Sequence, residues 1–168
     1  MKFNYIKTLV AGSALMALGL GASAANAAAS ATANATATIT GSIALASTAN
    51  LAFGSIVPTG AGTVTISAAG VQTCTALLTC TGTTTAAAFT ATANNSSVLT
   101  VTTPATVSLV GAGSATHTMT ATLTGPGATV TTGATGTVSF NVSGVLSVAA
   151  GQSPDSYSGT FSETVTYQ

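Results

Sequence analysis

Few side chains in this chain could do chemistry: the sequence holds two cysteines, one histidine and two carboxylates. General acid–base catalysis needs ionisable groups that are held close together. His117, Asp155 and Glu163 are far apart in the sequence, and no serine lies in the Gly-x-Ser-x-Gly pattern of a nucleophile elbow. We therefore expect no enzymatic activity and no cofactor, and we interpret His117 as a surface residue of a strand.

The amino-terminal residues have the pattern of a secretory signal peptide. Lys2 and Lys7 flank the start of an apolar run, Leu9 to Leu20, and small residues follow up to Ala27. This order of positive, apolar and small residues predicts removal of residues 1–27. We expect export to the periplasm, the cell surface or the extracellular space. No later segment is long and apolar enough to predict a transmembrane helix.

Loss of the signal peptide would remove both cationic residues, because the sequence has no arginine and no other lysine. Proteins that bind nucleic acids neutralise phosphates with lysine and arginine. Anionic membrane surfaces attract proteins through the same side chains. The predicted mature chain, residues 28–168, is therefore not expected to bind either one.

Cys74 and Cys80 enclose the pentapeptide Thr-Ala-Leu-Leu-Thr. In an exported chain, an isolated pair of cysteines predicts a disulfide. Closing so short a loop would stabilise the fold by about 2–3 kcal/mol on the chain-entropy estimate. A metal site is less favoured, since such sites usually have about four ligands and the single histidine is distant in sequence.

The pattern of residues 46–168 predicts one all-β domain. Threonine and valine are abundant, and β-branched residues favour strands. Short alternating segments recur between glycine, proline and asparagine, which indicates an antiparallel sandwich or barrel. The expected strands cover residues 51–58, 63–67, 88–93, 98–102, 105–110, 116–123, 137–142, 145–148 and 157–167.

A longer alternation occupies residues 28–45. The odd positions from Ala29 to Leu45 are alanine, isoleucine, glycine or leucine, whereas the even positions are mostly serine, threonine and asparagine. The period predicts a strand. Its first half offers only methyl groups, so the segment is either an exposed tail or a strand that awaits a partner.

Three motifs carry a resemblance to a known family. They are Phe-Gly-Ser-Ile-Val-Pro at 53–58, Gly-Val-Leu-Ser-Val at 144–148 in a run ending at Gln152, and Tyr-Ser-Gly-Thr-Phe at the start of the tail 157–168. The chain resembles the bacterial family called domain of unknown function 4402. That family is similar to spore coat protein U and to archaic chaperone–usher pilins. The resemblance implies an antiparallel immunoglobulin-like β-sandwich.

Three positions depart from the family pattern. Ser143 precedes Gly144 where a second glycine is usual, and Asp155 stands in a turn where glycine is expected. Glu163 replaces an apolar residue on the face shared with Phe161 and Val165. Because a lone carboxylate in a core is costly, we expect Glu163 at a bulge or where this face reaches solvent.

The resemblance to pilins also implies a mechanism of assembly. Those subunits lack one strand, and an extended segment of the next subunit fills the gap by donor-strand complementation. Residues 28–45 are the candidate donor here. The side chains that would fill successive pockets, together with the glycine that would permit close approach, are Ala35, Ala37, Ile39, Gly41 and Ile43. The implied partners are further copies of the chain, a periplasmic chaperone and an outer-membrane usher.

The scarcity of charge supports association independently of any family. Soluble proteins protect exposed sheet edges with lysine and other charges, but the predicted mature chain has no lysine and only two carboxylates. The favoured hypothesis is a filament or pilus-like subunit that polymerises by strand exchange. The alternative is a secreted monomeric adhesin, glycan-binding or matrix protein on the same sandwich, with a threonine-rich face as its binding surface. Burial of residues 29–37 in their own domain would favour the alternative.

Overall fold

The computed structural model describes residues 28–168, so the predicted signal peptide at residues 1–27 lies outside the described residues. Thr38–Gln168 form one compact unit, and residues 28–37 belong to a separate one. No helix occurs among residues 28–168, and the folded part is entirely antiparallel β-structure. Thirteen strands are present in this unit. They are β1 (Ala44–Ala49), β2 (Ser55–Pro58), β3 (Gly62–Ile66), β4 (Gln72–Cys74), β5 (Leu78–Thr81), β6 (Ala87–Thr92), β7 (Val98–Thr102), β8 (Thr106–Gly111), β9 (Thr118–Thr124), β10 (Thr129–Thr131), β11 (Thr137–Val148), β12 (Tyr157–Ser158) and β13 (Thr164–Tyr167).

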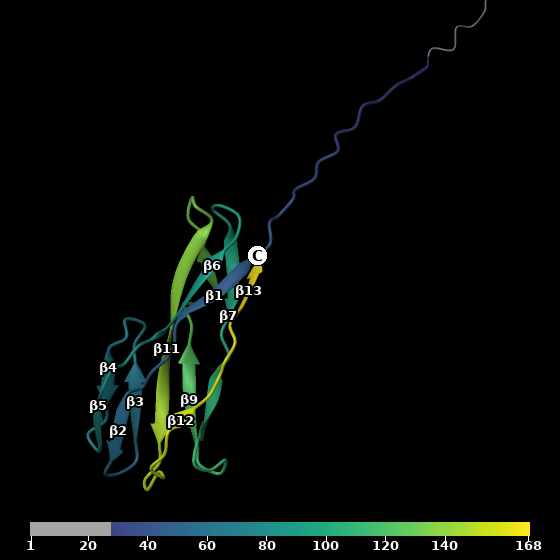
Figure 1. Ribbon diagram of the computed structural model, residues 1–168. Coiled ribbons are helices and arrows are strands. Elements are labelled where there is room, and N and C mark those ends of the chain that lie inside the picture. Colours follow the sequence, from purple (N-terminus) through teal and green to yellow (C-terminus); the bar gives the residue numbers. More distant parts are fainter. Residues whose placement is uncertain (1–27) are drawn as a thin grey trace, which may run out of the picture. The chain divides into compact units, whose positions relative to one another are not determined.

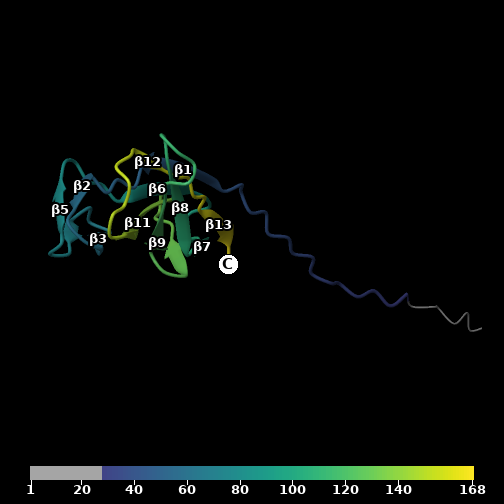
Figure 2. The same ribbon diagram turned by 90° about the horizontal axis from the view of Figure 1, so that it is seen from below.

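The strands form a curled, sandwich-like arrangement of sheets (Figure 1). The largest sheet has the order β1-β6-β11-β9-β8-β12, with β3 between β11 and β4. A second sheet has the order β10-β7-β13, and β2 pairs with β5 alone. Both views place β2 and β5 on the side of the domain where β3 lies (Figures 1 and 2).

Strand β11 links the two halves of the largest sheet. Residues 137–142 pair with β6, residues 143–147 pair with β9 on one side, and residues 144–148 pair with β3 on the other. Gly144 was expected to separate two strands, but it lies within one strand of 12 residues. Its missing side chain leaves room for Leu51 and Phe53, which pack against its backbone.

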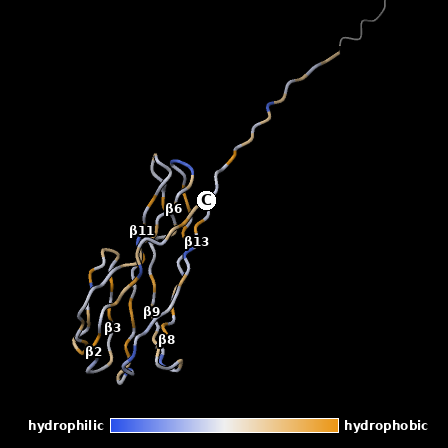
Figure 3. Tube along the Cα trace, viewed as in Figure 1, coloured by the Kyte–Doolittle hydropathy of each residue, from blue (hydrophilic) through white to orange (hydrophobic). Residues whose placement is uncertain are grey.

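Alternation along the strands builds the core. Met119, Ala121 and Leu123 of β9 are buried, while the threonines between them are exposed. Figure 3 shows hydrophobic residues recurring along the strands of the domain, separated by weakly polar ones. Phe89 and Phe140 are register partners on β6 and β11, with ring centroids 5.7 Å apart. The alternation of the expected strands predicts a set of core positions, and all of them are buried or packed against the buried cluster, namely Phe53, Ile66, Phe89, Val101, Leu109, Met119, Leu123, Phe140, Leu146, Tyr157, Phe161, Val165 and Tyr167.

Several strand boundaries differ from expectation. The first strand begins at Ala44 rather than at residue 29, because residues 29–43 have no pairing strand among residues 28–168. The region around the cysteines was expected to be a connection, yet it contains β4 and β5, which pair with β3 and β2. The tail is two strands rather than one, since β12 pairs with β8 and β13 pairs with β7.

Across residues 28–168, the structure contains no helix with the length and hydrophobicity required to cross a membrane.

Candidate functional site

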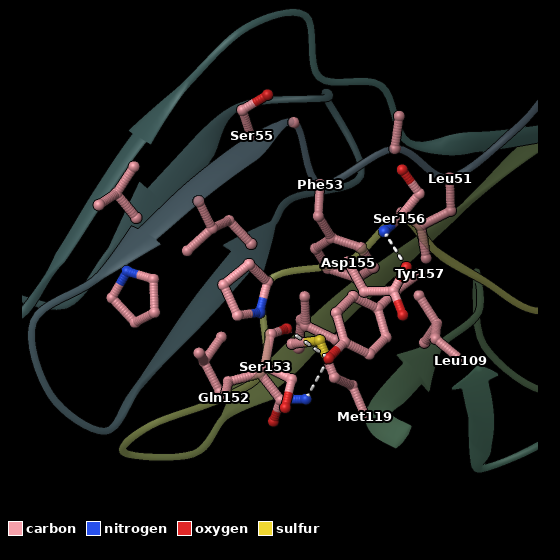
Figure 4. Close-up of a pocket in the computed structure, with 18 of the residues that line it drawn as sticks. Leu51, Phe53, Ser55, Leu109, Met119, Gln152, Ser153, Asp155, Ser156 and Tyr157 are labelled. Carbon is pink, nitrogen blue, oxygen red and sulfur yellow. Dashed lines mark hydrogen bonds between the residues drawn. The ribbon is translucent and has the colours of Figure 1, made fainter. Parts of the chain in front are cut away.

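A cleft of about 910 Å³ opens in the domain formed by Thr38–Gln168 (Figure 4). Its lining comes from Leu51–Pro58, from Gly151–Tyr157 and from apolar side chains of three strands of the largest sheet. Those side chains are Leu109 of β8, Met119 of β9, and Leu146 and Val148 of β11. The lining is therefore mainly apolar, and its one charged side chain is Asp155.

Two strands that line the cleft are sheet edges. Strand β2 pairs with β5, and β12 pairs with β8; within the described residues, neither has a second partner. An edge strand presents unpaired main-chain N–H and C=O groups. The cleft thus combines apolar side chains with two strands that are each paired on one side.

The first lining segment, Leu51–Pro58, is shaped by Gly54. This glycine has φ of +76°, a left-handed conformation that side chains disfavour, and a β-carbon there would also come 3.2 Å from Thr84. Before the turn, Phe53 packs into the core and its carbonyl accepts a 2.7 Å hydrogen bond from Gln72 Nε2. After it, Ile56 is half-buried. The Phe-Gly-Ser-Ile-Val-Pro motif therefore forms one side of the cleft.

The second lining segment, Gly151–Tyr157, is held by a hydrogen-bond network that Figure 4 shows in part. The Tyr157 hydroxyl donates to the Ser153 carbonyl at 2.7 Å and accepts from Gln152 Nε2 at 2.6 Å. Gln152 Nε2 also lies 3.3 Å from the Thr118 carbonyl of β9. This network joins the segment to the main sheet.

Asp155 and His117 form a hydrogen-bonded pair, and His117, which was expected as a surface residue of a strand, lies in the turn before β9 instead. His117 Nδ1 lies 2.8 Å from Asp155 Oδ2, and the Gly113 and Ser156 amides donate to the same carboxylate. The hydrogen bond from His117, followed by that from Gly113, lowers the pKa of Asp155 below its ordinary value. The two residues are 38 positions apart, so spacing gave no indication of the pair. The replacement of an expected turn glycine by Asp155 was the one available signal.

Comparison with known families matches residues 43–167 to a family model described as a domain of unknown function, DUF4402. The chain belongs to the DUF4402 family. No curated protein and no solved structure matches it. The match begins immediately before β1 and ends at Tyr167 of β13, so it covers the folded domain and excludes residues 28–42.

The disulfide predicted between Cys74 and Cys80 is present in the DUF4402 domain. It joins β4 to β5, and Cys80 is the register partner of Ile56 on β2. The crosslink therefore supports the two-stranded sheet that carries one side of the cleft. Among the described residues, no group of three or more His, Cys, Asp or Glu side chains is placed to hold a metal ion.

The five candidate donor residues do not form one site within the chain. Ala35, Ala37 and Ile39 are exposed outside any strand, and Ile39 has 93% of its surface accessible. The Gly41 amide donates to Asn94 Oδ1 at 3.0 Å, and Ile43 packs partly against the core. Residues 28–42, which include residues 29–37, are exposed throughout.

Glu163 differs from its expected environment. Only 9% of its surface is accessible, so the expectation of solvent exposure was wrong, although it does lie in the unpaired stretch between β12 and β13. The Thr103 hydroxyl donates to Oε2 at 2.8 Å, and Oε1 is buried with no hydrogen-bond partner. Burial raises the pKa of this carboxyl above its ordinary value.

Proposed function

We propose that this DUF4402 protein is an exported, non-enzymatic structural subunit of a cell-surface filament, and that its copies join by strand exchange. The observation that carries the proposal is the apolar cleft lined by β2 and β12, each paired on one side only. The occupant is the amino-terminal segment of a second copy of the chain.

The chemistry of the cleft suits an extended strand. Main-chain groups on the edge strands would supply hydrogen bonds, as in other cases of β-strand addition. Side chains of an added strand point alternately to its two faces. One face would therefore meet Leu109, Met119 and Leu146, while the other would remain in solvent.

The properties of residues 28–40 match these requirements. The segment is exposed, carries no charge and alternates small apolar residues with hydroxyl or amide residues. Ile39 is its large apolar side chain, so it is the expected anchor. Gly41 and Ile43 contact their own domain, which sets the end of the free segment near residue 40. Joining unlike surfaces head to tail produces an open filament.

Export is part of the proposal. A disulfide such as Cys74–Cys80 is typical of an oxidising compartment, and the predicted signal peptide supplies the route. Before assembly, the exposed apolar cleft would favour non-specific association, so a periplasmic chaperone and an outer-membrane usher are reasonable partners. The absence of catalysis belongs to the proposal as well, because the Asp155 carboxylate is engaged by three donor groups.

A second candidate function rests on the exposed face of the largest sheet. Two rows of hydroxyl residues cross neighbouring strands there. One row contains Ser108, Thr120, Ser147 and Thr63, and the other contains Thr106, Thr122, Thr65 and Thr73, with Val145 of β11 between Thr122 and Thr65. Such a face favours a secreted adhesin, glycan-binding or matrix protein on the same sandwich, and that protein would act as a monomer.

Surface material sheared from producing cells would distinguish the two functions. It would be run on a denaturing gel with and without boiling and probed for this protein. A ladder that collapses to one band on boiling is the result expected for strand-exchanged polymers. A single monomer band in both lanes would contradict the filament and favour the adhesin.

A further inference from the structure

The domain is nearly free of charge, yet its one close contact between an acidic and a basic side chain among residues 28–168 lies at the cleft. Asp155 contributes to the lining, and His117 holds it from the turn between β8 and β9. Only 9% of the Asp155 side chain and 33% of the His117 side chain are accessible. A partly buried pair is screened less by solvent than a fully exposed one.

We call this cluster the Asp155 clasp: the Asp155 carboxylate, His117 Nδ1, and the Gly113 and Ser156 amides. The Gly113 amide lies 3.0 Å from Oδ1 and 3.1 Å from Oδ2, and the Ser156 amide lies 2.7 Å from Oδ1. Hydrogen bonds to a charged acceptor are stronger than those between neutral groups. The clasp therefore fastens the lining segment Gly151–Tyr157 to the turn that joins β8 and β9.

Other contacts of this segment are limited. Strand β12 has two residues, and the Ala112 amide donates to the Ser156 carbonyl at 2.9 Å. The remaining attachments are the network of Gln152 and Tyr157, the pairing of β12 with β8 and the packing of Tyr157 against the core. Since so few bonds hold the segment, its position beside the cleft depends on the clasp.

We propose that the Asp155 clasp is a pH-sensitive latch that sets how long an inserted strand stays in the cleft. This inference rests on the proposed function. With Asp155 ionised, the segment is held in place and supports the occupant. When acid protonates Asp155, its charge-assisted hydrogen bonds weaken, the segment loosens and the occupant leaves faster.

The titratable groups around the clasp are few. His117 faces Asp155 from the turn, and Tyr157 follows on the same segment, where its hydroxyl is bonded to Ser153 and Gln152. The facing segment Leu51–Pro58 has no titratable side chain, and Glu163 lies outside the cleft lining. Because the pKa of Asp155 is lowered in the folded protein, the clasp is intact above the ordinary value of 3.8 and is lost as the pH falls through the folded value.

Release of a labelled peptide tests the latch. The protein, dissociated and refolded at high dilution, is loaded with a fluorescein-labelled peptide of residues 28–42 and chased with unlabelled peptide. We expect about fivefold faster release from His117→Gln than from the wild type, as for a modest, partly exposed ion pair. Thr120→Gln, which places the same side chain on the exposed face of β9, is expected to release at the wild-type rate. Equal rates in wild type and His117→Gln would overturn the inference.

A second measurement needs no variant. The titration of the Asp155 carboxyl is followed by NMR in the wild type, with and without unlabelled peptide. Linkage is reciprocal, so if protonation of Asp155 weakens peptide binding at equilibrium, bound peptide must lower the proton affinity of Asp155 by the same factor. If the midpoint of the Asp155 titration is the same with and without peptide, the latch is overturned and the proposed function is not. Failure of the peptide to bind wild-type protein would instead remove the proposed function and the latch together.

Discussion

Gly144 and Phe53 are in direct contact at the point where β11 passes from one pairing partner to the next. A β-carbon on Gly144 would come within 3.0 Å of Phe53 Cζ and 2.8 Å of Leu51 Cδ2. Phe53 and Gly144 belong to two of the motifs that carry the family resemblance. Their contact explains both motifs physically, because it seats the segment Leu51–Pro58 against the main sheet and so forms one side of the cleft.

A larger residue at position 144 should therefore destabilise the domain. We expect Gly144→Val to lower the free energy of unfolding by about 2 kcal/mol, as overpacking in a filled core usually does. Denaturant titration measures this change. Gly133→Val is the matched control, because the nearest atom to a β-carbon there is 3.6 Å away. Equal losses in the two variants would show that the contact with Phe53 is not the cause.

Glu163 should make stability depend on pH. Its pKa is raised in the folded state, so the unfolded chain ionises first, near the ordinary value of 4.5. The contribution of Glu163 to the free energy of unfolding is then greatest below pH 4.5 and declines as the pH rises through the folded pKa of this carboxyl. Glu163→Gln cannot ionise, and we expect it to abolish this decline and to be more stable than the wild type at pH 7. Thermal melts from pH 3 to pH 8 measure both effects, and a parallel pH profile in the variant would refute the assignment.

The disulfide should stabilise both the domain and the cleft. Replacing Cys74 and Cys80 together by alanine is expected to cost about 2 kcal/mol of unfolding free energy on the chain-entropy estimate. Because Cys80 is paired with Ile56, the same variant should also bind the peptide of residues 28–42 more weakly. Calorimetry and peptide titration give the two readouts. Unchanged peptide affinity in a destabilised variant would mean that β2 keeps its place without the crosslink.

Ile39 should be required for assembly but not for folding. Its side chain is 93% accessible, so Ile39→Asp is expected to change the free energy of unfolding by no more than about 0.5 kcal/mol. Burying the new carboxylate in an apolar cleft is costly, and the boiling-sensitive ladder should disappear. Thr38→Asp places the same charge on the opposite face of the segment and should retain the ladder. Loss of the ladder in both variants would show that charge, rather than the apolar face, is responsible.

The all-β domain, its core positions and the disulfide could be predicted from the sequence because local signals determine them. Alternation and β-branched residues indicate the strands and their buried faces, and two nearby cysteines indicate the disulfide. It did not predict the Asp155–His117 pair or the cleft, since both depend on segments distant in sequence that the topology brings together. The strand expected from residue 29 was placed too early for a related reason. Alternation shows which residues could pair, but the partner of Ala44–Ala49 is β6, and residues 28–43 have no such neighbour within the part of the chain that the structure describes.

The central claim is that residues 28–40 of one copy occupy the cleft of another, and hydrogen exchange tests it most directly. Amide exchange would be compared between the dissociated protein and the same protein saturated with the peptide of residues 28–42. The account predicts slower exchange in Leu51–Pro58 and Gly151–Ser158, the two segments whose strand edges would acquire a partner. Unchanged exchange in both segments, or protection confined to the threonine rows on the opposite face, would contradict it.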